Sequence, residues 1–98
     1  MKFRYHPQVQ RELKEAVTWY EEQRYGLGDD FFDQFTAALH QIGERPETFS
    51  FWLGSKKVRR VKLRRFPYDL LFEICPNTVR ILCLRHVKRH PSYGLHRR

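Results

Sequence analysis

Long apolar runs are missing from this sequence of 98 residues. No stretch approaches the roughly 18 consecutive apolar residues that a membrane-spanning helix requires. The N-terminal residues, MKFRYHP, also lack the apolar segment of a secretory signal peptide. Disorder is disfavoured as well, because 41% of the residues are hydrophobic and 15% are aromatic. We therefore expect a single cytoplasmic domain over residues 1–98, ending in a basic tail at residues 86–98.

Cysteine is scarce too: the chain has only Cys75 and Cys83, which form no CxxC pair. On neighbouring strands of one hairpin, Cys75 would face Thr78 and Cys83 would face about Leu70. The two sulfurs would then be out of register for a disulfide. We predict two reduced thiols in a reducing compartment.

Recognisable catalytic and cofactor motifs are also absent. The sequence shows no Ser/His/Asp arrangement, no glycine-rich phosphate loop and no pair of carboxylates. The tail histidines His86, His90 and His96 match no zinc-binding spacing, and the surrounding cations would repel a metal ion. We predict neither a metal nor a cofactor.

Acidic residues are nearly missing from the second half of the chain. Residues 1–50 hold six Lys or Arg against nine Asp or Glu, a net charge of −3. Residues 51–98 hold thirteen against two, a net charge of +11. This asymmetry favours a polyanionic partner for the second half: nucleic acid, a ribosome or an acidic protein.

The positive charge is densest in residues 56–65, KKVRRVKLRR. Side chains alternate between the two faces of a strand, so Val61 and Leu63 fall on one face. Arg60, Lys62 and Arg64 fall together on the other. The apolar face would meet a core, and the row of cations would form a binding surface. A solvated edge strand that cations protect from aggregation is the simpler alternative.

Two amphipathic helices precede this basic segment. Apolar residues at helical spacing predict a first helix over about residues 7–24, with Glu12 mostly on its solvent side. Gly26 is expected to cap the end of this helix. Asp29 or Asp30 would then cap a second helix, whose apolar stripe runs to about residue 43.

Strand patterns complete the chain at residues 2–5, 57–65, 68–75 and 78–86. The order β-α-α-β-β-β predicts an α+β fold, in which a two-helix hairpin packs on one face of an antiparallel sheet. Two helices cover only one face, so the other face must be solvated or bound. We expect Arg60, Lys62 and Arg64 on that open face, and a loosely ordered tail after it.

Several segments resemble the RelE/ParE superfamily of type II toxin–antitoxin toxins. The segment WYEEQRYGLGDDFFDQF is similar to that family's first helix, Gly-Leu-Gly loop and second helix, and RPETF to its connector. VRRVKLRRFPYDLLFEI resembles the central hairpin, and VRILCLRHVKRHPSY the last strand and tail. The details of FPYDLLF and HVKRHP resemble the ParE-like, plasmid-stabilisation branch more closely.

The resemblance implies a toxin that is neutralised by a cognate antitoxin. RelE-like members cut mRNA on the ribosome, whereas ParE-like members inhibit DNA gyrase and have no agreed catalytic residues. The antitoxin would be a small acidic protein whose extended or helical segment covers the toxin's sheet edge or helix groove. No membrane is involved.

Cleavage of mRNA without a metal would need a base, an acid and cations around the reacting phosphate. Arg60 and Lys62 match two basic positions that ribonuclease members carry on this strand. Arg89 resembles a tail arginine of that group, and Tyr93 or His86 would transfer a proton. These five residues are the candidate catalytic set.

The candidate residues for binding nucleic acid or another target are Lys56, Lys57, Arg64, Arg65, Arg85 and Lys88. One residue argues against cleavage: ribonuclease members carry an arginine directly after the hairpin tyrosine, whereas Asp69 follows Tyr68 here. A carboxylate at that position would repel a phosphate. The alternatives are therefore a gyrase inhibitor, a ribosome-dependent endoribonuclease, and a non-toxic or decayed basic module that binds RNA or protein.

Overall fold

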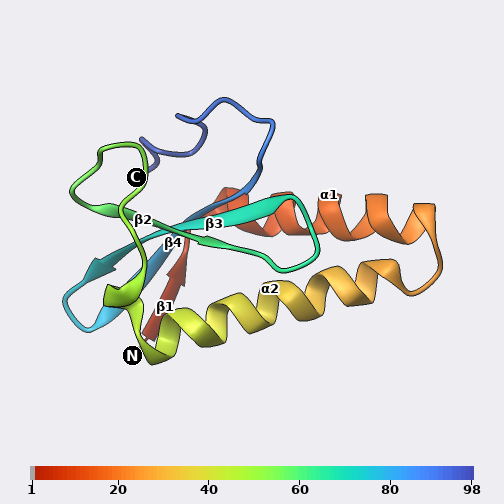
Figure 1. Ribbon diagram of the computed structural model, residues 1–98, viewed down its shortest axis with the longest axis horizontal. Coiled ribbons are helices and arrows are strands. Elements are labelled where there is room, and N and C mark those ends of the chain that lie inside the picture. Colours follow the sequence, from red (N-terminus) through yellow and green to blue (C-terminus); the bar gives the residue numbers. More distant parts are fainter. Residues whose placement is uncertain (1) are drawn as a thin grey trace.

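One strand, two helices and three further strands follow one another along the chain (Figure 1). The computed structural model describes residues 2–98. Its elements are β1 (Lys2–Tyr5), α1 (Pro7–Gln23), α2 (Leu27–Glu44), the 3-10 helix η1 (Pro46–Thr48), β2 (Val58–Lys62), β3 (Tyr68–Cys75) and β4 (Thr78–His86). The α+β class and the βααβββ order are confirmed.

The four strands form one sheet in the order β1-β4-β3-β2. β2, β3 and β4 are antiparallel neighbours, as expected. β1 instead runs parallel to β4, so the sheet is mixed rather than antiparallel throughout. A parallel pair needs a long connection, and both helices lie between β1 and β4 in the chain. This pairing makes β4 a central strand, which explains why both of its faces are largely buried.

β2 is shorter than predicted and ends at Lys62 rather than at residue 65. The turn to β3 begins at once, because the Leu63 N–H donates to the Tyr68 carbonyl at 2.9 Å. Arg65 adopts a left-handed φ of 72° in this turn. Arg64 and Arg65 therefore extend from a loop and not from the strand.

The connection between the helices differs from the expected capping. Gly26 is the N-cap of α2 rather than the end of α1, and Asp29 and Asp30 lie in the first turn of α2. The Glu21 carboxylate accepts hydrogen bonds from the backbone N–H groups of Gly26 and Gly28. A side chain of α1 thus satisfies the first N–H groups of α2, which otherwise have no partner within the helix.

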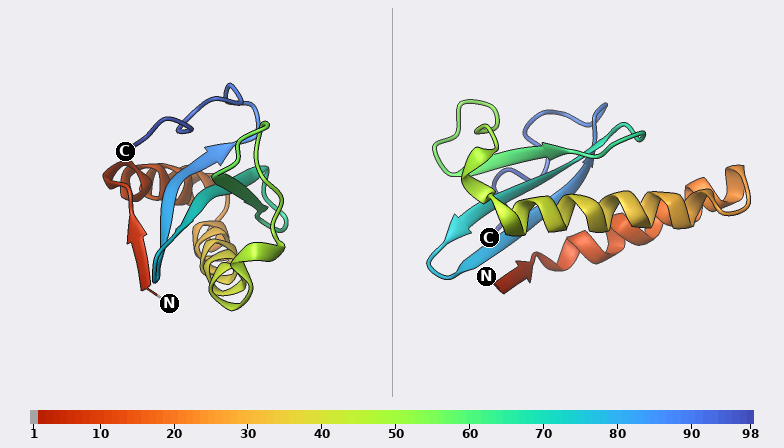
Figure 2. Two further views of the ribbon diagram at one scale, coloured as in Figure 1. Left: turned by 90° about the vertical axis from the view of Figure 1, so that its left-hand side faces the viewer. Right: turned by 60° about the horizontal axis from the view of Figure 1, so that its bottom comes forward.

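The two helices cover one face of the sheet, and their far ends project beyond it (Figure 2). Their apolar stripes meet the strands in the main core, where Phe31, Ile42, Leu70 and Phe72 are completely buried. Each such side chain contributes roughly 1.5–3 kcal/mol through its burial. Within residues 2–98, no helix has both the length and the apolar character needed to cross a membrane.

The opposite face of the sheet is not open, contrary to expectation. The tail after β4 lies across the sheet from α2 (Figures 1 and 2). A second, smaller core forms there from Val58, Leu71, Leu82 and Cys83, with Trp52, Tyr93 and Leu95 packed against it. The tail is therefore not loosely ordered, because its apolar side chains replace water over the sheet. We call this covered surface the tail face.

Both cysteines are free thiols, as predicted. Cys75 faces Thr78 across the hairpin, whereas Cys83 faces Leu71 rather than Leu70. The shift of one residue arises from an irregularity in the ladder between β3 and β4 next to Leu71.

Candidate functional site

Asp69 lies on the tail face and is completely buried. Arg85, which is 3% exposed, donates to both of its carboxylate oxygens, at 3.2 Å from Nε and 3.1 Å from Nη2. The Arg60 guanidinium lies 3.8 Å from the same carboxylate. Two guanidinium groups therefore offset the negative charge that was expected to repel a phosphate.

Arg85 itself is occupied inside the protein. Its Nη1 donates to the carbonyl of Arg89 at 2.8 Å, and its other nitrogens hold Asp69. The prediction that Arg85 is a target-binding residue is thus contradicted by its burial. Its role is to join β3, β4 and the start of the tail.

Trp52 connects this charged cluster to the tail. The Arg60 and Arg85 guanidinium groups lie 4.7 Å and 4.9 Å from the centre of its rings, within the range of a cation–π interaction. The indole N–H donates to the Pro91 carbonyl at 2.9 Å. Arg60 is consequently held between an aromatic ring and a carboxylate, with one third of its side chain exposed.

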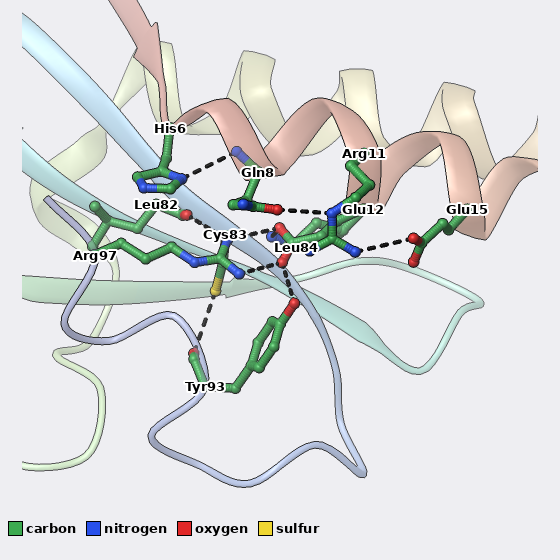
Figure 3. Close-up of polar contacts among 10 residues, drawn as sticks. All are labelled: His6, Gln8, Arg11, Glu12, Glu15, Leu82, Cys83, Leu84, Tyr93 and Arg97. Atoms are coloured by element: carbon green, nitrogen blue, oxygen red, sulfur yellow. Dashed lines mark hydrogen bonds and ion pairs between the residues drawn. The ribbon is translucent and has the colours of Figure 1, made fainter.

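Glu12 forms a second polar cluster, which joins α1, β4 and the tail (Figure 3). Its carboxylate accepts hydrogen bonds from the Leu84 N–H at 3.1 Å and from the Tyr93 hydroxyl. Arg97 binds both oxygens, at 3.0 Å and 2.6 Å. Glu12 is 7% exposed, so its expected position on the solvent side of the first helix was wrong. This cluster fastens the end of the tail to the body of the protein.

Three of the five candidate catalytic residues lie together. His86, Arg89 and Tyr93 line a hollow of about 200 Å³ between α1, β4 and the tail. The Arg89 guanidinium lies 4.8 Å from the centre of the Tyr93 ring. Arg60 and Lys62 line none of this hollow and lie on β2 instead. The structure therefore divides the candidate catalytic set into two groups.

The proton-transfer candidates are engaged in hydrogen bonds. The Tyr93 hydroxyl donates to Glu12, and the His86 Nδ1 accepts from the Lys88 backbone N–H at 3.0 Å. A neutral His86 with this bond carries its hydrogen on Nε2. Among residues 2–98, no group of three His, Cys, Asp or Glu side chains is placed to hold a metal ion.

Five of the six candidate target-binding residues remain on the surface: Lys56, Lys57, Arg64, Arg65 and Lys88 are exposed. Lys62, from the catalytic set, is also exposed, at the end of β2. Arg65 lies 3.6 Å from the Asp30 carboxylate, which offsets part of its charge. Lys56 and Lys57 also line a shallow hollow of about 380 Å³ with Phe51 and Cys75. We call the exposed residues Lys56, Lys57, Lys62, Arg64 and Lys88 the basic surface.

The burial of Glu12, Asp69 and Arg85 in these clusters was not predicted from the sequence. For Glu12 a signal existed, because it lies three residues after Val9 and four before Ala16, both of which are buried. That spacing puts the carboxylate on the apolar stripe of α1. For the pairing of Asp69 with Arg85 no such signal existed, because the expected register places Leu84 opposite Asp69 and only the irregularity next to Leu71 brings Arg85 there.

Comparisons with known proteins bear on the family and the fold. A family described as the ParE toxin of the type II toxin–antitoxin system parDE matches residues 3–91. A solved structure titled as the chromosomal ParDE toxin–antitoxin system from P. aeruginosa superimposes with a TM-score of 0.71 and 13% sequence identity. The superposition covers 90% of this chain and 97% of the other. A search of curated protein sequences found no match. At such low identity, the structural likeness supports the fold.

Proposed function

This chain belongs to the ParE toxin family of type II toxin–antitoxin systems, and from that membership we propose that it stops bacterial growth by binding DNA gyrase in the cytoplasm. The family match over residues 3–91 is the observation that carries the proposal. Members of the ParE-like branch inhibit gyrase, whereas RelE-like members cleave mRNA. Binding rather than cleavage is the activity proposed for this chain.

The state of the candidate catalytic residues supports inhibition by binding. Cleavage of RNA needs a free group that can accept or donate a proton at the reacting oxygen. The Tyr93 hydroxyl is bound to Glu12, and Arg60 is held by Trp52 and Asp69. Tyr93 and Arg60 could act in cleavage only after these contacts break, whereas His86 has only its Nδ1 engaged.

The basic surface supplies the contact in this proposal. Its five exposed cations present positive charge toward a partner that holds DNA or carries acidic side chains. Complementary charge increases the rate of association and its dependence on salt more than it increases the final affinity. Variants of the basic surface should therefore slow the binding of gyrase and reduce its salt dependence.

An acidic antitoxin is the second partner in the proposal. β1 is an edge strand of four residues that pairs only with β4, so its outer edge offers backbone groups for an added strand. Beside it lies a hollow of about 340 Å³ lined by Tyr5, Val9, Leu13 and Phe35, among others. An extended segment on β1, with apolar side chains in this hollow, fits both features.

The test is induction of the protein in a bacterial host, with a gyrase supercoiling assay and mapping of mRNA 5′ ends. We expect growth arrest, loss of supercoiling and intact mRNA. Lys62→Glu should weaken the arrest, because it reverses one charge of the basic surface. Lys14→Glu is the matched control, since Lys14 is also an exposed lysine but lies on α1.

One observation favours a second candidate function, mRNA cleavage on the ribosome. Lys62 is exposed on the strand that also carries Arg60, as the resemblance to ribonuclease members implies. New mRNA ends that disappear in Lys62→Ala, with normal supercoiling, would establish this reading and overturn the first. Salt-sensitive binding of nucleic acid without growth arrest would instead indicate a non-toxic module.

A further inference from the structure

Aromatic rings line a hollow at the end of the sheet that none of the roles above uses. It measures about 440 Å³, within the usual range for small-molecule sites, and its walls are Trp19, Tyr20, Pro67, Tyr68 and His86. We call it the ring hollow. It shares Trp19, Tyr68 and His86 with the smaller hollow beside Arg89. Three parts of the chain therefore converge at the ring hollow: α1, the turn before β3 with the start of that strand, and the end of β4. The tail lines only the smaller hollow beside it.

The rings form a continuous series of contacts. Trp19 meets Tyr20 with ring centres 5.0 Å apart, Tyr20 meets Tyr68 at 6.2 Å, and Tyr68 meets His86 at 5.0 Å. Tyr20 and Tyr68 also belong to the edge of the main core, which holds them rigidly. Trp19 remains 55% exposed at the rim. Packing in the main core does not explain why so much of the Trp19 ring stays in water. A ligand that stacks on this ring would explain it.

The shape of the ring hollow selects a flat occupant. Four of its five lining residues carry flat aromatic rings, and the fifth is Pro67. The hollow beside β1 differs, because Val9 and Leu13 contribute aliphatic side chains that suit an apolar side chain of a peptide. Successive rings instead match the flat faces of nucleobases, which stack on aromatic side chains in proteins that bind single strands.

The charges around the ring hollow select an anionic occupant. Arg89 and Lys88 are exposed next to His86. The nearby carboxylates are already paired, Glu12 with Arg97 and Glu15 with Arg11. The positive groups therefore remain available for an incoming phosphate, and the His86 Nε2 hydrogen adds a neutral donor.

We propose that the ring hollow binds an unstacked base of a single-stranded nucleic acid, with the adjoining phosphate on Arg89 and Lys88. The base stacks on Trp19, and the remaining rings form the walls that exclude water. The inference does not depend on gyrase as the target. A toxin that failed to inhibit gyrase would still bind a single strand in this way.

Binding is measured by the anisotropy of a labelled single-stranded oligodeoxynucleotide and by quenching of tryptophan fluorescence. Trp19→Leu should weaken binding roughly tenfold, because stacking on one aromatic side chain is lost. Tyr25→Leu is the matched control, since Tyr25 is 93% exposed but lies outside the hollow. Arg89→Gln should reduce the salt slope of binding by roughly 0.7 for the one phosphate contact that it removes.

One comparison ligand and one further variant make the test specific. A strand of equal length without bases should bind more weakly and leave the fluorescence of Trp19 unchanged. In Trp19→Phe, the intact strand should no longer quench, because the other tryptophan, Trp52, does not line the hollow.

Three outcomes would overturn the proposal. The first is equal binding of the baseless strand, and the second is equal loss of affinity in Trp19→Leu and Tyr25→Leu. The third is quenching by an acidic aromatic peptide but not by the oligonucleotide, which would make the ring hollow a protein-binding site. Circular dichroism of each variant distinguishes loss of binding from loss of fold.

Discussion

Replacement of Glu12 by glutamine is expected to loosen the tail more than any nearby surface change. The carboxylate joins three elements, because it accepts from Leu84 on β4 and from Tyr93 and Arg97 in the tail. Glutamine keeps the shape but loses the charge. Its amide NH2 group would face either the Arg97 guanidinium, which has no acceptor, or the Tyr93 hydroxyl, which would have to turn from donor to acceptor.

The expected loss follows from the burial of this pair. The side chains of Arg97 and Glu12 are 14% and 6% exposed, so Glu12→Gln leaves a largely buried cation without its partner. Removal of one partner from a buried ion pair costs about 3–5 kcal/mol. The Arg97 side chain is 14% exposed and can turn toward water, so we expect the lower limit, about 3 kcal/mol. For a domain of this size, the melting temperature would fall by roughly 12–24 °C.

The assay is unfolding in urea followed by circular dichroism, for both single variants and their combination. Arg97→Gln should cost less, about 1–2 kcal/mol, because Glu12 keeps its bonds to Leu84 and Tyr93. The double variant should lose less stability than the two single variants lose together, since both substitutions remove the same interaction between Glu12 and Arg97. Glu15→Gln is the matched control: Glu15 lies on the same helix and pairs with Arg11 in solvent.

The result that would refute this reasoning is a midpoint for Glu12→Gln equal to that of Glu15→Gln. Strict additivity of Glu12→Gln and Arg97→Gln would also count against it. Either result would mean that the tail is held by its apolar contacts with the sheet and not by the carboxylate.

Three further predictions concern the tail face. Gly94→Ala should destabilise the protein by about 1–3 kcal/mol more than Gly54→Ala in thermal unfolding. Both glycines have a positive φ, but an added Cβ at Gly94 would lie 2.5 Å from the Cys83 sulfur, whereas one at Gly54 would meet no atom within 4 Å. In the folded protein, Cys75 should react with a thiol reagent while Cys83 does not, because burial raises the pKa of the Cys83 thiol from 9.0 to about 12. The unfolded Cys83 thiol loses its proton near pH 9, whereas the folded thiol keeps it up to about pH 12. The free energy of unfolding should therefore fall between pH 9 and 12 by up to about 1.4 kcal/mol per pH unit. Cys83→Ala should remove the contribution of this thiol to the pH dependence of stability. Asp69→Asn should cost about 3–5 kcal/mol in urea unfolding, because it leaves its buried arginine partner with an unpaired charge; a cost below 1 kcal/mol would contradict the importance of this pair.

The helices and strands were predictable because their signals are local. Apolar residues three and four positions apart define α1 and α2, and apolar runs bounded by the turn residues Pro67, Pro76 and Asn77 define β3 and β4 at the observed bounds. The wrong details lie at element ends. Glu21 of α1 caps α2, and the residues next to the cap do not indicate such a contact between helices.

The candidate site was predicted less well than the fold. A list of cations can be read from the sequence, but their exposure cannot. Arg85 and Lys62 are both basic strand residues in the basic half of the chain, yet Arg85 is buried against Asp69 while Lys62 is exposed. Both face Asp69 across the sheet, so the facing residue does not explain the difference. Arg85 lies on the central strand β4 and binds both Asp69 oxygens, whereas Lys62 lies at the end of the edge strand β2.

The sequence alone determined the family, the order of elements and the excess of positive charge in the second half. All three are properties of residue type and short-range spacing. Tertiary structure decided which groups remain free to act. Glu12 and Arg97 are separated by 85 positions, and only the folded chain brings them together, closing the tail over a sheet face that the sequence left open. The free energy of such a pair depends on the distance between its two charged groups and on the exclusion of water. Both are fixed only when the protein folds.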